Sequence, residues 1–279
     1  MTKTRIAPTP SGFLHAGNAF NFLVTDKLAK ATGSRLVLRI DDLDAGRTRP
    51  EYIEDVFHSL EWLGIRVDEG PSGPDDFHSN WSQHLRMPRY RYVAEALRSH
   101  DALYPCLCSR TQLETLSRAD HTCRTQPITE VPSGTPWRLR IPEPCPVPIS
   151  ELDGTTEQHD LAALMPDPVI LQRDTERPAY QIASLCDDLD MGITFIVRGV
   201  DLLPSTACQA YVARLLGQDA FATIRFHHHP LALGSDGLKL SKSAGSSSLK
   251  AMRESGTSPD ALIASAHRYA EALLMGITP

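Results

Sequence analysis

Residues 3–18 read KTRIAPTPSGFLHAGN, and this stretch decides the fold. Residues 3–7 predict a short strand, and the prolines and glycine that follow them force a loop. From residue 16 to residue 31 apolar side chains recur at helical spacing, and Gly33 follows as a stop signal. A strand that enters a helix through such a loop is typical of a parallel sheet with helical crossovers.

The same alternation of strands and helices continues along the chain. Strands are expected at residues 35–40, 192–198 and 222–226, and helices at 51–63, 87–98 and 258–274, with a further helix around Leu215. We therefore predict the α/β class, with a Rossmann-type, doubly wound parallel sheet.

A proline-rich stretch interrupts this pattern. Residues 104–177 show few helical patterns and predict an inserted subdomain. The chain then divides into a first half of the Rossmann domain at 1–103, the insertion at 104–177, a second half at 178–254 and a C-terminal helix at 255–279.

Composition excludes several classes of protein. Of the 279 residues, 41% are hydrophobic and 22% are charged, as in an ordinary soluble globular chain. No apolar run approaches the roughly 18 residues that span a bilayer, and the N-terminus lacks the apolar core of a secretory signal. Six cysteines without an export signal do not suggest a disulfide framework. We expect a cytoplasmic protein with no membrane attachment.

Charge is unevenly distributed along the chain. The net charge of −6 provides no general attraction to nucleic acid. Residues 1–50, however, hold eight Lys/Arg against four Asp, and residues 225–253 hold five against one. If the fold brings these two segments together they form an anion site; otherwise they are solvated faces.

The start of the first predicted helix suits a phosphate. A helix N-terminus offers unpaired N–H groups and a partial positive charge. Gly17 has no Cβ and allows close approach to the backbone, while His15 can donate a hydrogen bond to a phosphate oxygen. The alternative is a Pro/Gly turn that happens to carry a histidine.

A second motif lies far along the chain. Residues 234–243 read GSDGLKLSKS, with Lys239 and Lys242 alternating with hydroxyl side chains. Such a loop can close over a polyphosphate and stabilise the charge on a leaving pyrophosphate. The alternative is a linker whose lysines serve solubility.

Together the two motifs resemble the signatures of class I aminoacyl-tRNA synthetases, His-Ile-Gly-His and Lys-Met-Ser-Lys-Ser. They read His-Ala-Gly-Asn at 15–18 and Lys-Leu-Ser-Lys-Ser at 239–243. Matches at residues 5–12, 39–44, 179–181 and 196–202 resemble the glutamate-handling branch of that class. The resemblance runs from Arg5 to Ser243 and implies that 104–177 is an acceptor-side subdomain.

The length after the lysine motif refines the resemblance. Only 36 residues follow Ser243, whereas glutamyl-tRNA synthetases carry anticodon-reading domains there. The chain therefore resembles the short glutamyl-queuosine tRNA(Asp) synthetase family. Its members activate L-glutamate with ATP and attach it to the queuosine base of tRNA(Asp) rather than to the 3′ end.

The resemblance assigns a role to individual residues. The residues that it places around glutamate are Arg5, Ala7, Thr9, Asp41, Tyr180 and Arg198. Those that it places around ATP are His15, Gly17, Asn18, Ser241, Lys242 and Ser243. The catalytic groups that it implies are His15, Lys239 and Lys242. Chemically, an arginine fork is the natural partner of a carboxylate, and Asp41 can hold the α-ammonium. The alternative for the charged residues is an ordinary ion-pair network. Many relatives carry Glu at the position of Asp41 and Asn at that of Gln181, which bears on amino-acid selectivity.

The expected reaction needs no protein nucleophile. The α-carboxylate of glutamate attacks the α-phosphorus of ATP, with Mg²⁺ on the phosphates, and pyrophosphate leaves. Positioning and charge neutralisation accomplish most of such chemistry.

Three cysteines suggest a zinc site. Cys106, Cys108 and Cys123 resemble the family's pattern of Cys-x-Cys followed by Tyr and Cys four apart, but Ala119 stands at the tyrosine position. A structural zinc ion takes four ligands, so His121 or Asp120 is the expected replacement. The alternative is three free thiols without a metal.

The remaining cysteines and a run of histidines indicate no metal. Cys145, Cys186 and Cys208 are interpreted as packing residues. Within residues 227–229, HHH, alternation along a strand lets no more than two imidazoles converge. We expect no metal there.

Three functions remain open from the sequence. The first is a ligase that charges glutamate onto tRNA. The second makes glutamyl-adenylate but passes glutamate to another acceptor, and the third is a non-enzymatic binding paralogue. Intact His15, Gly17, Lys239 and Lys242 count against the third. No pattern indicates an oligomeric state.

Overall fold

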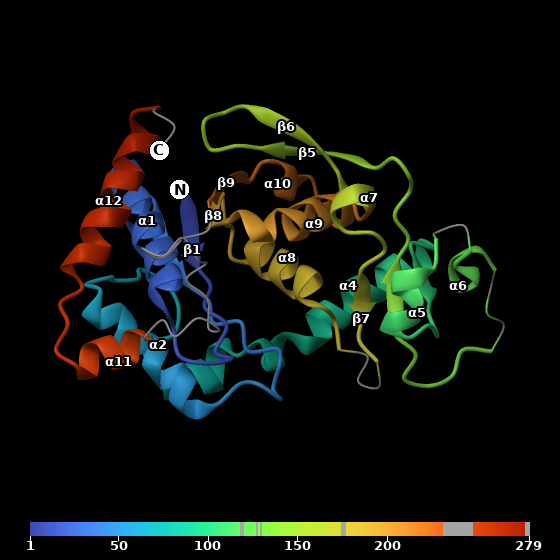
Figure 1. Cartoon of the computed structure of the whole chain (residues 1–279), viewed down its shortest axis with the longest axis horizontal. Helices are drawn as coiled ribbons and strands as arrows, with labels where there is room; N and C mark the ends of the chain where they lie inside the picture. The colour runs from blue at the N-terminus through green and yellow to red at the C-terminus, as the bar shows by residue number, and fades with distance from the viewer. Residues whose placement is uncertain (118–119, 127, 129, 174–176, 231–247, 277–279) are drawn as a thin grey trace.

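The computed structural model describes residues 1–117, 120–126, 128, 130–173, 177–230 and 248–276 (Figure 1).

Two pairs of parallel strands form the centre of the molecule. β1 (Lys3–Ile6) pairs with β2 (Arg35–Leu38), and β8 (Phe195–Gly199) pairs with β9 (Arg225–His229). The pairs meet where the Thr194 N–H donates to the Lys3 carbonyl at 2.8 Å. The strands therefore lie in the order β2, β1, β8, β9, and a parallel bridge from Val37 to Glu69 extends the outer edge.

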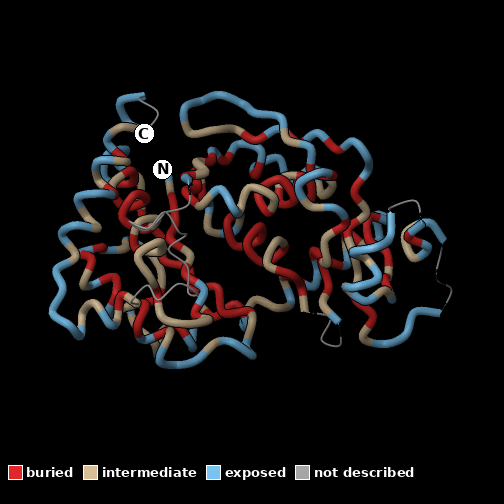
Figure 2. Tube along the Cα trace, in the orientation of Figure 1, coloured by how far each residue is buried: buried red, intermediate tan, exposed pale blue. Residues whose placement is uncertain are grey.

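Both faces of these strands are buried. Leu36 and Leu38 of β2 enter one apolar cluster and Val37 enters the other, as side chains that alternate along a strand must. Helices α1 (Ala16–Thr32) and α12 (Asp260–Leu274) belong to the first cluster, while α8 (Tyr180–Asp190) and α9 (Leu203–Leu215) belong to the second. Figure 2 shows the buried residues where these helices face the strands. This is the doubly wound α/β arrangement expected from the sequence.

Helix α1 has a defined stop at each end. His15 caps its start. At its end Gly33 adopts a φ of 63°, in the left-handed region that glycine tolerates, and its N–H donates to carbonyls of the last turn. The helix packs against β1, β8 and α12.

Two further helices lie at their predicted positions, α2 (Pro50–Trp62) and α4 (Met87–Ser99). Short helical elements that were not predicted complete this part of the described chain: α3 (Pro74–Asp76), a π-helical turn (Phe77–Trp81), a 3₁₀ turn η2 (Gln83–Arg86), a 3₁₀ turn η3 (Val200–Leu202), α10 (Asp219–Ala222) and α11 (Leu249–Glu254). The strand expected at 222–226 begins later, at Arg225, because residues 219–222 form the short helix α10.

Residues 103–171 form a second, antiparallel layer. β3 (Leu103–Pro105), β4 (Trp137–Leu139) and β7 (Val169–Leu171) make one sheet in the order β3, β4, β7. β5 (Pro146–Ser150) and β6 (Thr156–Asp160) form a hairpin, and α5 (Arg110–Thr115), α6 (Thr122–Thr125) and α7 (Leu161–Leu164) complete the region.

The hairpin shares a core with the parallel strands. Val147 and Ile149 of β5 belong to the same buried cluster as Ala207 and Tyr211 of α9. Apolar packing thus crosses from the insertion into the second half of the Rossmann domain, and the boundaries at 103/104, 177/178 and 254/255 stay predictions. Within the described part of the chain, no helix combines the length and apolar character needed to cross a membrane.

Candidate active site

A buried guanidinium organises the charged side chains at the ends of the parallel strands. Arg39, just beyond β2, donates from Nε to Asp41 Oδ1 and from Nη1 to Asp188 Oδ1, both at 2.7 Å, and from Nη2 to Ser184 Oγ at 3.0 Å. Burial acts to lower the pKa of Arg39, but Asp41 and Asp188 outweigh it and the pKa is raised. Arg39 is therefore protonated and positively charged in the folded protein.

Asp188 of α8 is shared between two arginines. Arg5 Nε, at the end of β1, donates to Asp188 Oδ1 at 3.0 Å, and both side chains are buried. Burial favours a higher pKa for Asp188, but Arg39 and Arg5 overcome this effect and hold the pKa below its usual value. The predicted glutamate ligand Arg5 is thus fixed by a carboxylate from a distant helix.

Arg198, in β8, lacks such a carboxylate. It is 2% exposed, and among the described residues no carboxylate oxygen lies within 4.0 Å of its guanidinium. Nη1 donates to Gln209 Oε1 at 3.1 Å, while Nε and Nη2 have no hydrogen-bond partner. Burial lowers the pKa of Arg198 to about 10, and the nearby charge of Arg5 contributes. A buried guanidinium that has open donors and no carboxylate partner is suited to bind an anionic ligand.

The carboxylates of this cluster are not shared evenly among its arginines. Arg5 and Arg39 contact the carboxylates of Asp41, Asp187 and Asp188, and Asp187 is also engaged by Arg86 at 2.7 Å and by Tyr90. Arg198 is buried and has no carboxylate partner among the described residues. Such a site attracts an anionic group.

The other residues predicted around glutamate lie beside this cluster. The Asp41 carboxylate accepts from Arg39 and, at 3.2 Å, from Gln83 Nε2. Burial raises the pKa of Asp41 although Arg39 opposes the rise. Tyr180, at the start of α8, is half-buried and lies close enough to Arg198 to act against the lowering of the Arg198 pKa. The structure therefore brings Arg5, Asp41, Tyr180 and Arg198 into one neighbourhood; Ala7 is half-buried and Thr9 exposed in the loop after β1.

The cap of α1 orients His15. Its Nδ1 accepts from the Gly17 N–H at 3.1 Å, and its backbone N–H donates to Asn18 Oδ1 at 3.1 Å. Because Nδ1 is an acceptor, the neutral ring carries its proton on Nε2. The first turn of α1 contains no acidic residue, so the positive end of the helix is not neutralised from within that turn.

Lys239, Ser241, Lys242 and Ser243 lie outside the described residues, but both flanks of their segment are placed. Before it, His229 Nε2 lies 3.0 Å from Asn21 Nδ2 of α1. After it, the Leu249 N–H donates to the Leu14 carbonyl at 2.8 Å. The fold therefore brings residues on both sides of the lysine segment to the first turns of α1.

The three histidines of β9 point to different partners. His227 Nε2 lies 3.0 Å from the Tyr269 hydroxyl, and His228 Nε2 lies 2.8 Å from Thr206 Oγ1. Burial lowers the pKa of all three, that of His227 to about 4. Each imidazole therefore acts as a neutral packing and hydrogen-bonding group.

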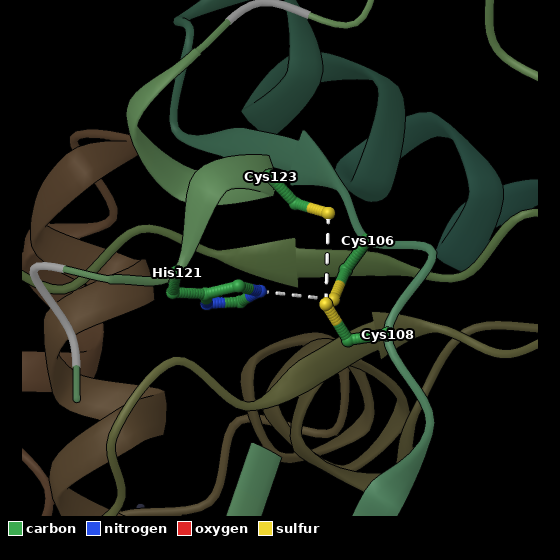
Figure 3. A group of neighbouring side chains, drawn as sticks. All are labelled: Cys106, Cys108, His121 and Cys123. Carbon is green, nitrogen blue, oxygen red and sulfur yellow. Dashed lines mark hydrogen bonds between the residues drawn. The ribbon is translucent and has the colours of Figure 1, made fainter. Parts of the chain in front are cut away.

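Cys106, Cys108, His121 and Cys123 converge in the insertion (Figure 3). Their four ligand atoms all lie within 4.8 Å of one another. Cys106 Sγ is 3.3 Å from His121 Nε2, and Cys108 Sγ is 3.7 Å from Cys123 Sγ. Three thiols and one imidazole are a donor set typical of structural zinc.

Contacts around this group favour His121 over Asp120 as the fourth ligand. The Asp120 carboxylate is exposed and accepts from Ser117 Oγ at 2.5 Å. His121 Nδ1 lies 3.5 Å from the Tyr104 hydroxyl, which donates to Asp167 Oδ2 at 2.9 Å. Burial lowers the pKa of His121 and favours the neutral ring that a metal requires.

Sequence reasoning missed several buried polar residues of the site. Asp187 and Asp188 form an acidic pair among the buried residues of helix α8, and Gln209 is a buried amide in helix α9. The sequence signal that could have identified these residues is a charged or amide side chain at a helix position where the apolar spacing predicts burial. The sequence motif at residues 39–44 predicts no separate role for Arg39, yet its guanidinium is central to the network.

Known proteins resemble this chain over nearly its whole length. Residues 1–272 match the family model described as "tRNA synthetases class I (E and Q), catalytic domain". The chain is 36% identical to a Glutamyl-Q tRNA(Asp) synthetase of Symbiobacterium thermophilum, covering 93% of this chain and 83% of that protein. It is 33% identical to a Glutamate–tRNA ligase of Coprothermobacter proteolyticus, covering 93% of this chain but 56% of that protein.

A solved structure shares the fold. A glutamate tRNA ligase from Elizabethkingia meningosepticum, crystallised in complex with its amino acid, superimposes with a TM-score of 0.74 at 25% identity. The match covers 95% of this chain and 60% of that one. The Rossmann-type fold expected from the sequence is confirmed.

Proposed function

Because the chain belongs to the class I tRNA synthetase family, as an E and Q catalytic domain, we propose that it activates glutamate with ATP and transfers it to tRNA. The relatives at 33–36% identity carry the names Glutamyl-Q tRNA(Asp) synthetase and Glutamate–tRNA ligase. Both names describe the joining of glutamate to tRNA.

The uncompensated charge of Arg198 carries the proposal. Free glutamate has two carboxylates and one ammonium, and Arg198 is a buried cation with no carboxylate partner among the described residues. The open Nε and Nη2 edge of Arg198 suits a carboxylate in bidentate fashion. Asp41 is the acid that would hold the ammonium, and it would share its oxygens with Arg39.

ATP would lie at the start of α1. His15 would donate from Nε2 to a phosphate oxygen, and the helix end with Gly17 and Asn18 would stabilise the negative charge. Lys239 and Lys242, with Ser241 and Ser243, would neutralise the departing pyrophosphate, and the placed flanks of their segment support this role. Mg²⁺ accompanies the phosphates and offsets their charge. The chain's own contribution is to align the glutamate α-carboxylate with the α-phosphorus.

For the acceptor, we propose the queuosine base of tRNA(Asp). The match covers 83% of the Glutamyl-Q tRNA(Asp) synthetase of Symbiobacterium thermophilum but 56% of the Glutamate–tRNA ligase of Coprothermobacter proteolyticus, which favours the first kind of relative. Charging at the tRNA 3′ end and transfer to a different acceptor are the competing outcomes.

We also propose that Cys106, Cys108, His121 and Cys123 bind zinc. Their atoms fit within the spread of one tetrahedral ion, and the donors are those that zinc prefers. When bound, the ion would tie the segment after β3, which holds Cys106 and Cys108, to the start of α6, where His121 and Cys123 lie 15 residues further along the chain.

One experiment tests both the reaction and the acceptor. The protein is incubated with ATP, labelled glutamate and tRNA from which the terminal 3′ adenosine has been removed. Label that enters this tRNA, and maps to the anticodon fragment after ribonuclease digestion, supports queuosine charging. Label that enters only intact tRNA would identify 3′-end charging instead.

Two controls separate the remaining functions. tRNA from cells that lack queuosine should accept no label if the proposal is right. Formation of AMP and pyrophosphate without labelling of any tRNA would point to another acceptor, and absence of both reactions would point to a binding protein.

A further inference from the structure

Buried donors without acceptors gather around one glutamine. Gln209 of α9 is fully buried, and its Oε1 accepts from Arg198 Nη1 at 3.1 Å. Gln209 Nε2, Arg198 Nε and Arg198 Nη2 are all buried, and within the described ranges none has a hydrogen-bond partner. Buried polar groups are nearly always paired, so three orphaned atoms on two touching side chains indicate a missing ligand.

All three orphaned atoms are donors. The contact with Arg198 decides which end of the Gln209 amide is oxygen, because a guanidinium can only donate. The amide nitrogen is therefore left to donate as well. A ligand group that satisfies this neighbourhood offers acceptors only, as a carboxylate does, whereas a carboxamide would present its own N–H₂ to these donors.

The fork of Arg198 is held by the same contact. Nε and Nη2 lie on one edge of the guanidinium, and Nη1 lies on the other. Because Gln209 occupies Nη1, the edge with two open donors is directed away from it. The face of Phe226, 5.4 Å from the guanidinium carbon, restricts the side chain further.

From this geometry we infer that Gln209 is a positioning and specificity-determining residue for the amino-acid substrate. It orients the open edge of Arg198 toward the substrate's side-chain carboxylate and withholds any acceptor from a carboxamide, so that glutamate is accepted and glutamine is rejected. This inference rests on the proposed activation of glutamate and adds a residue to it.

The test compares three variants by calorimetric titration with glutamate and with glutamine. In Gln209→Met the amide is lost at similar volume. In Gln209→Glu a carboxylate stands beside Arg198 and competes with the substrate. Gln218→Met is the matched control, since Gln218 is exposed just beyond the same helix and its side-chain amide donates to the Leu216 carbonyl at 3.3 Å.

We expect Gln209→Met to weaken glutamate binding about 10- to 100-fold, the effect of one lost hydrogen bond to a charged group. Its preference for glutamate over glutamine should fall by about tenfold or more. Gln209→Glu should weaken glutamate binding further while its Tm does not fall, because Arg198 then has a partner within the chain. In pyrophosphate exchange Gln209→Met should raise the KM for glutamate and leave the KM for ATP and the kcat largely unchanged.

Specific outcomes would overturn the inference. One is that Gln209→Met keeps both its glutamate affinity and its preference for glutamate over glutamine within twofold of the wild type. Another is that Gln209→Met lowers the kcat but leaves the KM for glutamate unchanged, which marks a purely structural role. If Gln209→Met does not fold, unchanged glutamate affinity in Gln209→Glu is the overturning result. A wild-type protein that binds glutamate but catalyses no exchange would instead contradict the proposed function.

Discussion

Replacing Arg198 by methionine should leave the stability of the free protein within about 1 kcal/mol of the wild type while abolishing its use of glutamate. Arg198 is 2% exposed, and burial lowers its pKa from the usual value of an arginine to about 10. That difference corresponds to a cost of about 3 kcal/mol for keeping the charge in the folded protein. Methionine has a similar length and removes the charge.

The substitution also has costs. The hydrogen bond from the Arg198 guanidinium to Gln209 Oε1 is lost at about 1.5 to 3 kcal/mol, and the contact with the Phe226 ring at about 0.5 kcal/mol. The gain and the costs nearly cancel, so we expect the Tm of the variant to stay within about 2 °C of the wild type. Glutamate, which should raise the Tm of the wild type by binding the folded state, should have no effect on the variant.

Thermal and urea unfolding with and without glutamate provide the assay. Arg214→Met is the control, because Arg214 is an exposed arginine of α9 and its loss should change stability by less than about 0.5 kcal/mol. A loss of about 2 kcal/mol or more in Arg198→Met, where large core effects begin, would refute the description of Arg198 as uncompensated. So would an equal glutamate-induced rise in Tm in variant and wild type.

Three further predictions concern other parts of the molecule. Lys242→Ala should slow glutamate activation by about 10²- to 10³-fold without changing the unfolding curve, since the lost group stabilises developing charge; near-normal pyrophosphate exchange would contradict it. Asp188→Asn should cost about 3–5 kcal/mol at pH 7, because it leaves Arg5 and Arg39 short of a carboxylate. The pKa of Asp188 is lowered in the folded state, so the ionised carboxylate stabilises the protein at neutral pH and this contribution is lost as the pH falls through that lowered value. The difference in free energy of unfolding between variant and wild type, measured with urea, should therefore shrink below about pH 4. An equal difference at pH 7 and pH 3 would contradict this prediction. Asp167→Asn should weaken zinc affinity about 10- to 100-fold in chelator competition, because Asp167 orients His121 through Tyr104, whereas Asp160→Asn, which alters a helix cap elsewhere in the insertion, should not.

The positions of strands and helices could be predicted because each is marked by a local pattern. The apolar run at 35–40 and the spacing in 16–31 depend only on neighbouring residues. The start of β9 was displaced because residues 219–222 form a helical turn that no periodicity announces.

The composition of the site was harder to predict. Arg39 and Asp188 are 149 residues apart, and only the fold reveals that they are paired. The cysteine spacing indicated a metal group, but the choice between His121 and Asp120 depends on where the turn before α6 directs each side chain. Gln209 offered no motif, and its importance rests on atoms that lack partners.

The most direct test of glutamate activation is exchange of labelled pyrophosphate into ATP by the purified, ribonuclease-treated protein. The reaction contains Mg²⁺ and either glutamate, glutamine or aspartate, with and without added tRNA. The open donors of Arg198 and Gln209 predict exchange with glutamate and little with glutamine, whose carboxamide brings its own donors. Aspartate carries the same charge as glutamate but is one methylene shorter, so its exchange should be lower by about tenfold or more. Absence of glutamate-dependent exchange both with and without tRNA would contradict the account.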